Sequence, residues 1–216
     1  MTEPAATPSA IVSPPVAALP KFDPPLALGV LASGSGSNFA AIAQAITNGG
    51  LQAEIRVLIY NNPGVKVAER AAELGIPAIL LNHRHFRQRE DLDREIVRTL
   101  QQHGVEWVVM AGWMRIVTPV LLDAYDQRVI NIHPSLLPSF PGIHAIEQAL
   151  AAGVKIAGCT AHIACLKVDS GPILLQAAVP VFPADTPASL HARVQVQEHR
   201  ILPAAIALAA QQAGQR

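Results

Sequence analysis

Short apolar runs alternate with helix-like segments along most of the chain, and this alternation limits the possible folds more than any other feature. The runs are largely apolar, as in LALGVLAS at 26–33. The segments between them repeat apolar residues every three or four positions, as in FRQREDLDREIVRTLQQHG at 86–104. Strands that are apolar throughout need cover on both faces, so the pattern predicts a mostly parallel sheet between two layers of helices.

The predicted fold class is therefore α/β, a three-layer, Rossmann-like domain with a mostly parallel sheet of about seven strands and helices on both faces. Ligands bind at the carboxyl ends of the strands in such sheets. The last two strands are joined through KVDSG and can pair as a hairpin, while Thr186 and Pro187 fit the N-cap and first position of the closing helix. Strands are expected at 26–33, 53–60, 76–81, 106–112, 128–133, 156–166 and 172–181, and helices at 39–50, 65–75, 86–104, 144–153 and 186–202.

The N-terminal segment differs in composition from the rest. Seven of the 18 prolines fall within the first 25 residues, where they impair both helix and sheet hydrogen bonding. We expect residues 1–24 to form a disordered Pro/Ala-rich tail and residues 25–216 to form one domain.

Charge and cysteine content restrict the partners and the compartment. The formal net charge of the 216 residues is zero, which argues against a nucleic-acid surface. On one strand, Cys159 and Cys165 would lie about 20 Å apart, too far for a disulfide, and unpaired thiols fit a reducing compartment. No apolar run reaches the ~18 residues of a membrane span, and the N-terminus lacks the pattern of a secretory signal. A cytoplasmic protein with no membrane partner is expected.

The first strand ends in the glycine-rich loop ASGSGSNF. Gly34 and Gly36 allow the backbone to approach a ligand, and the helix that follows offers free N–H groups to a phosphate. The loop is not a dinucleotide-binding fingerprint, because Phe39 stands where the third glycine belongs, and no lysine follows as in a P-loop. An ordinary tight turn is the alternative.

The fourth strand ends in MAGWMRIV, where a loop should be polar. Its large apolar side chains either line a ligand pocket or cap the core. These side chains are Trp113, Met114, Ile116 and Val117.

The fifth strand ends in VINIHPSLLPSFPG. The period of two in a strand places Asn131 and His133 on one face and Ile132 on the other. An amide donor beside an imidazole can stabilise an oxyanion and move a proton. The prolines that follow stiffen the segment, which favours a functional site over a structural histidine.

Two further polar groups, Asp169 and Glu198, have two interpretations each. Asp169 either caps a turn before Ser-Gly or faces His133 and favours its charged form. Glu198 is either a solvated helix residue or a carboxylate that receives a substrate amine. A zinc site from the two cysteines and His162 is disfavoured, because His162 would face away from both cysteines on a strand.

Seven segments taken together resemble the glycinamide ribonucleotide formyltransferases, folate-dependent enzymes of purine synthesis. The signature N-x-H-P-S-L-L-P is shared by formyl-folate enzymes in general, whereas the complete set is much narrower. The segments occur in the order of the family and cover nearly everything after the tail: LASGSGSNFAAI, YNNPGVKVAERA, MAGWMRIV, NIHPSLLPSFPG, GCTAHI, VDSGPILLQAAVPV and RVQVQEH.

The resemblance implies a role for each matching position and a formyltransferase domain at 25–216. Asn131, His133 and Asp169 correspond to the catalytic trio, with His162 in a supporting position. The loop Gly36, Ser37 and Asn38, together with Glu198, corresponds to the site for glycinamide ribonucleotide. The folate-binding positions are Arg89, Met114, Arg115, Ile116, Val117 and Asn131. The family also carries a cis peptide bond at the position of Leu137–Pro138.

The implied reaction transfers the formyl group of 10-formyltetrahydrofolate, a co-substrate, to the amine of 5-phosphoribosylglycinamide. Asn131 and protonated His133 would stabilise the oxyanion, while Asp169 keeps His133 charged and aids proton relay. No step requires a metal. The expected partners are small molecules, with neither nucleic acid nor membrane, and the enzyme is expected to be a monomer or homodimer.

The sequence departs from the family at three places. Leu166 and Lys167 stand where relatives usually carry acidic residues, which predicts altered folate affinity, and Tyr60 stands where serine is common. The N-terminal tail has no counterpart. The alternatives are a formyl-folate hydrolase, a formyltransferase for initiator tRNA and a phosphate-binding module without catalysis. The first two would need an additional domain, and the third has no need for the trio.

Overall fold

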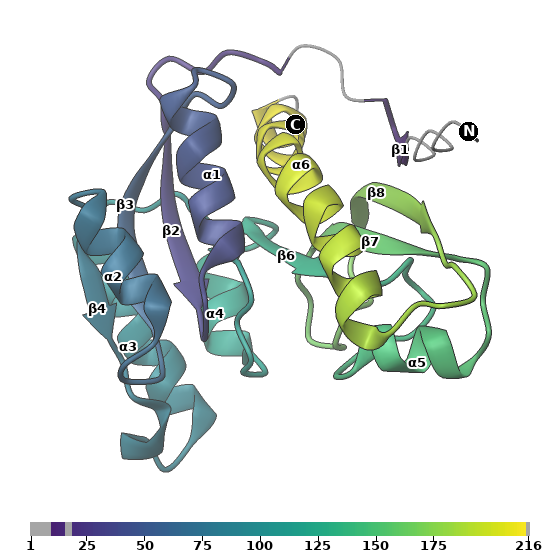
Figure 1. Cartoon of the computed structure of the whole chain (residues 1–216). Helices are drawn as coiled ribbons and strands as arrows, with labels where there is room; N and C mark the ends of the chain where they lie inside the picture. Colours follow the sequence, from purple (N-terminus) through teal and green to yellow (C-terminus); the bar gives the residue numbers. More distant parts are fainter. Residues whose placement is uncertain (1–9, 16–18, 215–216) are drawn as a thin grey trace.

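The structure, a computed structural model, describes residues 10–15 and 19–214, which form a sheet flanked by helices (Figure 1). Within these residues the sheet has eight strands in the order β1-β8-β7-β6-β5-β2-β3-β4. The strands are β1 (Ile11–Ser13), β2 (Leu26–Ala32), β3 (Ala53–Tyr60), β4 (Ala78–Leu80), β5 (Trp107–Met110), β6 (Val129–His133), β7 (Ile156–Ile163) and β8 (Ile173–Pro180). The helices are α1 (Ser37–Thr47), α2 (Lys66–Glu73), α3 (Arg89–Gln102), α4 (Pro119–Ala124), α5 (Ala145–Ala151) and α6 (Pro187–Gly214), with a 3-10 turn at His83–His85.

The predicted fold class is confirmed. Strands β2 to β6 pair in parallel, and β7, β8 and β1 continue the sheet by antiparallel pairing. The predicted hairpin of β7 and β8 is present. The chain moves outward from β2 in one direction through β3 and β4, and in the other through β5 and β6. The strand order therefore reverses between β2 and β5, which is where an open α/β sheet forms a ligand crevice.

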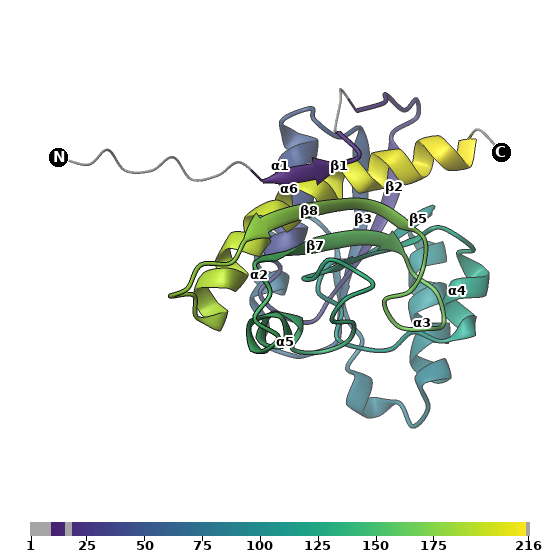
Figure 2. The same ribbon diagram turned by 90° about the vertical axis from the view of Figure 1, so that its right-hand side faces the viewer.

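Helices cover both faces of the sheet, and each layer has its own apolar core. Buried side chains of α1, α2 and α6 form one core with alternate residues of β2, including Leu28 and Val30. Leu31 points to the other face and packs with side chains of α3 and α4. Figure 1 shows α1 and α6 side by side on one face, and Figure 2 shows α3 and α4 across the sheet from α6.

The expectation of a disordered tail through residue 24 is wrong for Ile11–Ser13, which pair antiparallel with β8. Val12 is partly buried against the core, whereas Ile11 is 72% exposed. An edge strand needs hydrogen bonds on one side only, so prolines next to it are tolerated. Farther along, the Phe22 backbone N–H donates to Gln52 Oε1 at 2.7 Å. Residues 1–9 of the predicted tail lie outside the described residues.

The closing helix is longer than predicted. The helix was expected at 186–202, but α6 continues through Pro203 to Gly214. Pro203 costs a backbone hydrogen bond inside a helix. The residues around it are buried on all sides, from Ile201 to Ala207. This burial outweighs the local penalty, since tertiary packing provides most of the stability of a helix in a protein.

Candidate active site

A cavity of about 610 Å³ lies where the strand order reverses. Its wall is built by the loops that follow β2, β5 and β6, by the loop between β7 and β8, and by the first turns of α6. These segments are far apart in sequence, and the parallel sheet brings their ends to one edge. The structure thus places the predicted site where the fold class predicts a ligand.

The glycine-rich loop after β2, residues 34–38, has a geometry suited to an anion and is called the anion cradle below. Gly36 has φ +72°, and a Cβ on it would lie 2.3 Å from a Val67 methyl carbon, so only glycine fits there. The helix α1 that follows has no side-chain cap and no acidic residue in its first turn. Its first backbone N–H groups are therefore available to a phosphate at the positive end of the helix.

Helix α6 approaches this cradle with two polar side chains. Gln195 Nε2 donates to Ser37 Oγ at 3.1 Å, and Asn38 Nδ2 donates to Glu198 Oε2 at 3.0 Å. Glu198 is 5% exposed. Burial raises the pKa of its carboxyl above the ordinary value, although the Asn38 bond and the charges of His191 and His133 oppose the shift. A buried carboxylate beside the cradle is suited to bind a donor group of a ligand.

Asn131, His133 and Asp169 lie in direct contact. His133 Nδ1 is 3.3 Å from Asp169 Oδ2, and Asn131 Nδ2 donates to Asp169 Oδ1 at 3.3 Å. The other ring nitrogen of His133, Nε2, donates to the carbonyl oxygen of Phe140 at 2.8 Å. Both ring nitrogens face oxygen acceptors, an arrangement that a doubly protonated imidazole satisfies best. Ile132 belongs to the core on the opposite face, as the strand period predicted.

Asp169 is held in a strained backbone conformation, with φ +50°. Its Oδ2 also accepts the N–H of Gly142 at 2.8 Å, which ties two loops together. Burial raises the pKa of the carboxyl. The hydrogen bonds with His162 and Gly142 and the charge of His133 lower it by more, so the pKa is below the ordinary value. The site therefore contains a stable carboxylate beside the imidazole.

His162 supports the trio from the neighbouring strand. It stands opposite Asn131 in the antiparallel pairing of β6 and β7. Its Nδ1 donates to the carbonyl oxygen of Ile163 at 2.9 Å, and its Nε2 accepts from Asn131 Nδ2 at 3.1 Å. The two N–H groups of the Asn131 amide thus face His162 and Asp169, which fixes the orientation of the amide.

The proline-rich segment after β6 is fixed by a buried hydroxyl. Thr160 Oγ1 accepts the N–H of Leu137 at 3.0 Å and donates to the carbonyl oxygen of Ser135 at 2.7 Å. Gln176 Nε2 donates to Thr160 Oγ1 and to the Leu137 carbonyl, both at 2.9 Å. The Leu137–Pro138 bond is cis, as the resemblance implied. The prolines alone therefore do not hold the segment.

The apolar side chains of the loop after β5 both cap the core and line the cavity, the two alternatives that the sequence left open. Trp113 and Val117 are buried in the core of α3 and α4, whereas Met114 and Ile116 are 75% and 53% exposed, and all four line the cavity. The Met114 N–H donates to Ser33 Oγ at 2.9 Å, which joins this loop to the cradle. The loop therefore provides an apolar slot beside the anion cradle.

The structure does not bring every predicted residue to the site. Arg89 is exposed at the start of α3 and does not line the cavity, whereas Arg115 does. Three contributors were not predicted, namely Gln195, the Phe140 carbonyl and the Gly142 N–H. Gln195 lies three residues before Glu198, and this spacing places both side chains on one face of the helix, so Gln195 could have been predicted. The two backbone groups have no side-chain signal in the sequence.

The described residues contain no cluster of His, Cys, Asp and Glu side chains suited to a metal ion. Both cysteines are unpaired. They were expected on one strand at 156–166, but β7 ends at Ile163, so Cys165 lies beyond it. Burial raises the pKa of the Cys159 thiol.

No helix in the described part of the chain is both long and apolar enough to cross a membrane.

The fold and the site define a Rossmann-like α/β enzyme with an anion cradle, an apolar slot and an Asn-His-Asp cluster at one sheet edge. Residues 27–206 match the family model described as formyl transferase. The chain belongs to this family, and within it to the phosphoribosylglycinamide formyltransferases, as its relatives demonstrate.

Relatives of similar length carry that name. The chain is 40% identical over 177 residues to the phosphoribosylglycinamide formyltransferase of Bacillus subtilis, covering 82% of this chain and 91% of that protein. The crystal structure of glycinamide ribonucleotide transformylase 1 from Symbiobacterium toebii matches with a TM-score of 0.85 and 43% identity, covering 87% of this chain and 88% of that one.

Other relatives are much longer. The chain is 45% identical over 185 residues, or 85% of its length, to the trifunctional purine biosynthetic protein adenosine-3 of Drosophila pseudoobscura pseudoobscura. It spans only 14% of that protein, so the similarity concerns one part of it.

Proposed function

We propose that this enzyme transfers the formyl group of 10-formyltetrahydrofolate to the amine of 5-phosphoribosylglycinamide in de novo purine synthesis. The observation that carries the proposal is the contact of Asn131, His133 and Asp169 between the anion cradle and the apolar slot. The cradle suits the ribose phosphate, and the slot suits the flat pterin. The trio lies where the two ligands would meet.

The reaction begins when the amine of the ribonucleotide attacks the formyl carbon. The carbonyl oxygen becomes an oxyanion, which Asn131 and protonated His133 stabilise by donating hydrogen bonds. Asp169 favours the charged ring and helps relay the proton of the amine to the leaving N10 of the folate. Every proton in these steps is moved by residues of the chain or by the two substrates, and none requires a metal.

The ligand-free structure adds one requirement to this mechanism. The donors of Asn131 and His133 already face Asp169, His162 and the Phe140 carbonyl. One bond of each of the two residues must lengthen before both can donate to the oxyanion. For His133 the candidate is the bond from Nε2 to the Phe140 carbonyl, because Nδ1 contacts the Asp169 carboxylate. For Asn131 it is the 3.3 Å bond to Asp169, which is longer than the 3.1 Å bond to His162.

Residue assignments follow from position in the cavity. Gly36, Ser37 and Asn38 bind the phosphate, and Glu198 binds the glycinamide part of the ribonucleotide. His162 orients Asn131. The residues assigned to the folate are Met114, Arg115, Ile116, Val117 and Asn131. Arg89 lies outside the wall, so we assign it only to the part of the folate that extends beyond the cavity.

The same trio would also serve a hydrolase that releases formate from the folate. The anion cradle favours transfer, because hydrolysis needs water and no phosphorylated acceptor. We propose small-molecule partners, a monomer or homodimer, and a cytoplasmic location for this enzyme, the last because its two cysteines are unpaired.

An absorbance assay separates these functions. The enzyme is incubated with 10-formyl-5,8-dideazafolate, with and without glycinamide ribonucleotide, and release of the deformylated folate is followed. Transfer predicts release only with the ribonucleotide, and mass spectrometry should show the ribonucleotide heavier by one formyl group. Release without the ribonucleotide would indicate a hydrolase, and no release in either mixture would refute catalysis.

A further inference from the structure

His191 lies on the cavity wall and has no part in the site described above. It precedes Gln195 by four residues and Glu198 by seven, so the three side chains share one face of α6. Gln195 and Glu198 are fixed to the first turn of α1 by their bonds to Ser37 and Asn38. This register places His191 one helical turn, about 5.4 Å, from Gln195 along the same wall.

The backbone that carries His191 is firmly held. Thr186 and Ser189 form a reciprocal capping pair, in which each side-chain oxygen accepts the N–H of the other residue. Arg193 donates to both carboxylate oxygens of Asp185, at 2.7 and 2.8 Å. The first turns of α6 are thus fixed on both sides of His191, while its own side chain is exposed.

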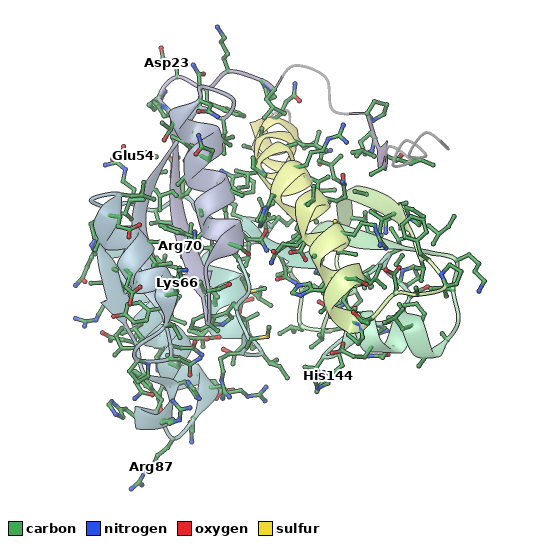
Figure 3. All side chains as sticks on the ribbon, in the orientation of Figure 1. Asp23, Glu54, Lys66, Arg70, Arg87 and His144 are labelled. Atoms are coloured by element: carbon green, nitrogen blue, oxygen red, sulfur yellow. The ribbon has the colours of Figure 1, made fainter. Side chains whose placement is uncertain are left out.

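The other imidazoles of the cavity wall are engaged. His133 and His162 contact Asp169, and the ring of His144 lies 3.7 Å from Glu147, at the outer edge of the protein near α5 (Figure 3). Within the described residues, the ring of His191 makes no hydrogen bond or ion pair, although its charge acts on Glu198.

The cradle itself contains no cationic side chain. Residues 34–38 are glycine, serine and asparagine, and α1 carries no charged residue at all. Arg115 lines the cavity from the loop after β5, on the side of the apolar slot. Lys66 begins α2 next to the cradle (Figure 3) but lies outside the cavity wall. A doubly charged phosphate bound only by neutral groups, near the Glu198 carboxyl, would lack a counter-charge.

We propose that His191 provides this counter-charge and binds the phosphate of the ribonucleotide together with the N-terminus of α1. The proposal rests on the proposed function, because it takes the ligand of the cradle to be a phosphorylated amine. It adds a side chain to substrate recognition. His191 would act on binding and not on the chemical step, because the trio lies on another wall of the cavity.

The test measures steady-state kinetics at pH 6, where an imidazole tends to be charged. The variant His191→Ala should raise the KM for glycinamide ribonucleotide about tenfold, the effect of losing one charge-assisted hydrogen bond. The inhibition constant of inorganic phosphate should rise by a similar factor. The kcat and the KM for 10-formyl-5,8-dideazafolate should stay within about twofold. His191→Lys should restore the KM, because it returns a cation to the same position.

Arg200→Ala is the matched control, because Arg200 is an exposed cation on the same helix outside the cavity wall. An unchanged KM and an unchanged phosphate inhibition constant in His191→Ala would overturn the proposal. An equal rise in the KM for the folate would also overturn it, since it would indicate a general distortion. Failure of the proposed function is a different result, namely a wild-type enzyme that does not formylate the ribonucleotide. In that case, calorimetry still tests the proposal, because the Kd of inorganic phosphate should be higher for His191→Ala than for the wild type.

Discussion

His133 Nδ1 lies 3.3 Å from Asp169 Oδ2, although His133 ends strand β6 and Asp169 lies in the loop between β7 and β8. The contact joins the end of β6 to the segment between β7 and β8. A carboxylate in this position stabilises the charged form of the imidazole. The proposed mechanism depends on this charge, since a neutral ring stabilises an oxyanion less well.

Asp169→Asn tests this dependence. The variant removes the charge but keeps the shape, so kcat for formyl transfer should fall by roughly 10²–10³ while substrate affinities change little. Asp126→Asn, an exposed carboxylate outside the cavity, is the control and should leave kcat unchanged. Turnover close to wild type in Asp169→Asn would contradict the role of the carboxylate.

The same variant predicts a pH dependence of stability. The pKa of Asp169 is lowered in the folded state, so its contribution is present above the unfolded-state value of about 3.9 and is lost as pH falls through the folded-state pKa. Urea unfolding should show wild type more stable than Asp169→Asn at pH 5, with a difference that shrinks toward pH 3. A difference that grows on acidification would contradict the assignment.

Glu198→Gln should stabilise the ligand-free protein. Burial raises the pKa of Glu198, so its contribution is fully present below the unfolded-state value of about 4.3 and is lost as pH rises. At pH 7 the variant should gain about 1 kcal/mol in the free energy of unfolding, or roughly 2–4 °C in Tm. The gain should vanish near pH 4. Affinity for the ribonucleotide should fall, and a variant that loses stability at pH 7 would refute the argument.

Thr160→Val tests the support of the proline-rich segment. The substitution keeps the volume but leaves the buried Leu137 N–H and Gln176 amide without their shared acceptor. We expect a loss of about 2–3 kcal/mol in the free energy of unfolding and a lower kcat. Thr47→Val is the control, because Thr47 only bonds back to the carbonyl of Ala43 within its own helix. Equal stability changes in the two variants would argue against a special role of Thr160.

Two neighbouring residues of β1 test the added edge strand. Val12 packs against the core and Ile11 points to solvent. Val12→Ala should lower the free energy of unfolding by about 0.5–1 kcal/mol, and Ile11→Ala should change it by less than about 0.3 kcal/mol. Catalysis should be unaffected by both. Identical unfolding curves for wild type and Val12→Ala would show that β1 contributes nothing to stability.

The sequence predicted the elements that burial dictates. The run at 26–33 is apolar because β2 is covered on both faces, and the positions of Asn131 and His133 on one face follow from the strand period. Outside the parallel part of the sheet, local sequence patterns did not predict strand β1 or the full length of α6. Prolines near Ile11–Ser13 concealed an edge strand, and α6 extends beyond its expected end at residue 202, through the buried Pro203.

Site residues were predictable where a side chain carries the chemistry. The resemblance identified Asn131, His133 and Asp169, and the sheet brings them together. The backbone groups of Phe140 and Gly142 were not predictable, because any residue supplies a carbonyl and an N–H. Their positions depend on a loop conformation that includes φ +55° at Phe140, which no local pattern announces.

The central claim is that the trio performs formyl transfer, and His133→Ala tests it most directly. The measurement is kcat with glycinamide ribonucleotide and 10-formyl-5,8-dideazafolate, alongside the Kd of each substrate by calorimetry. The account predicts a fall in kcat of at least about 10³, the sum of oxyanion and proton-transfer effects, with both Kd values within a few fold of wild type. A variant that turns over at the wild-type rate would contradict it.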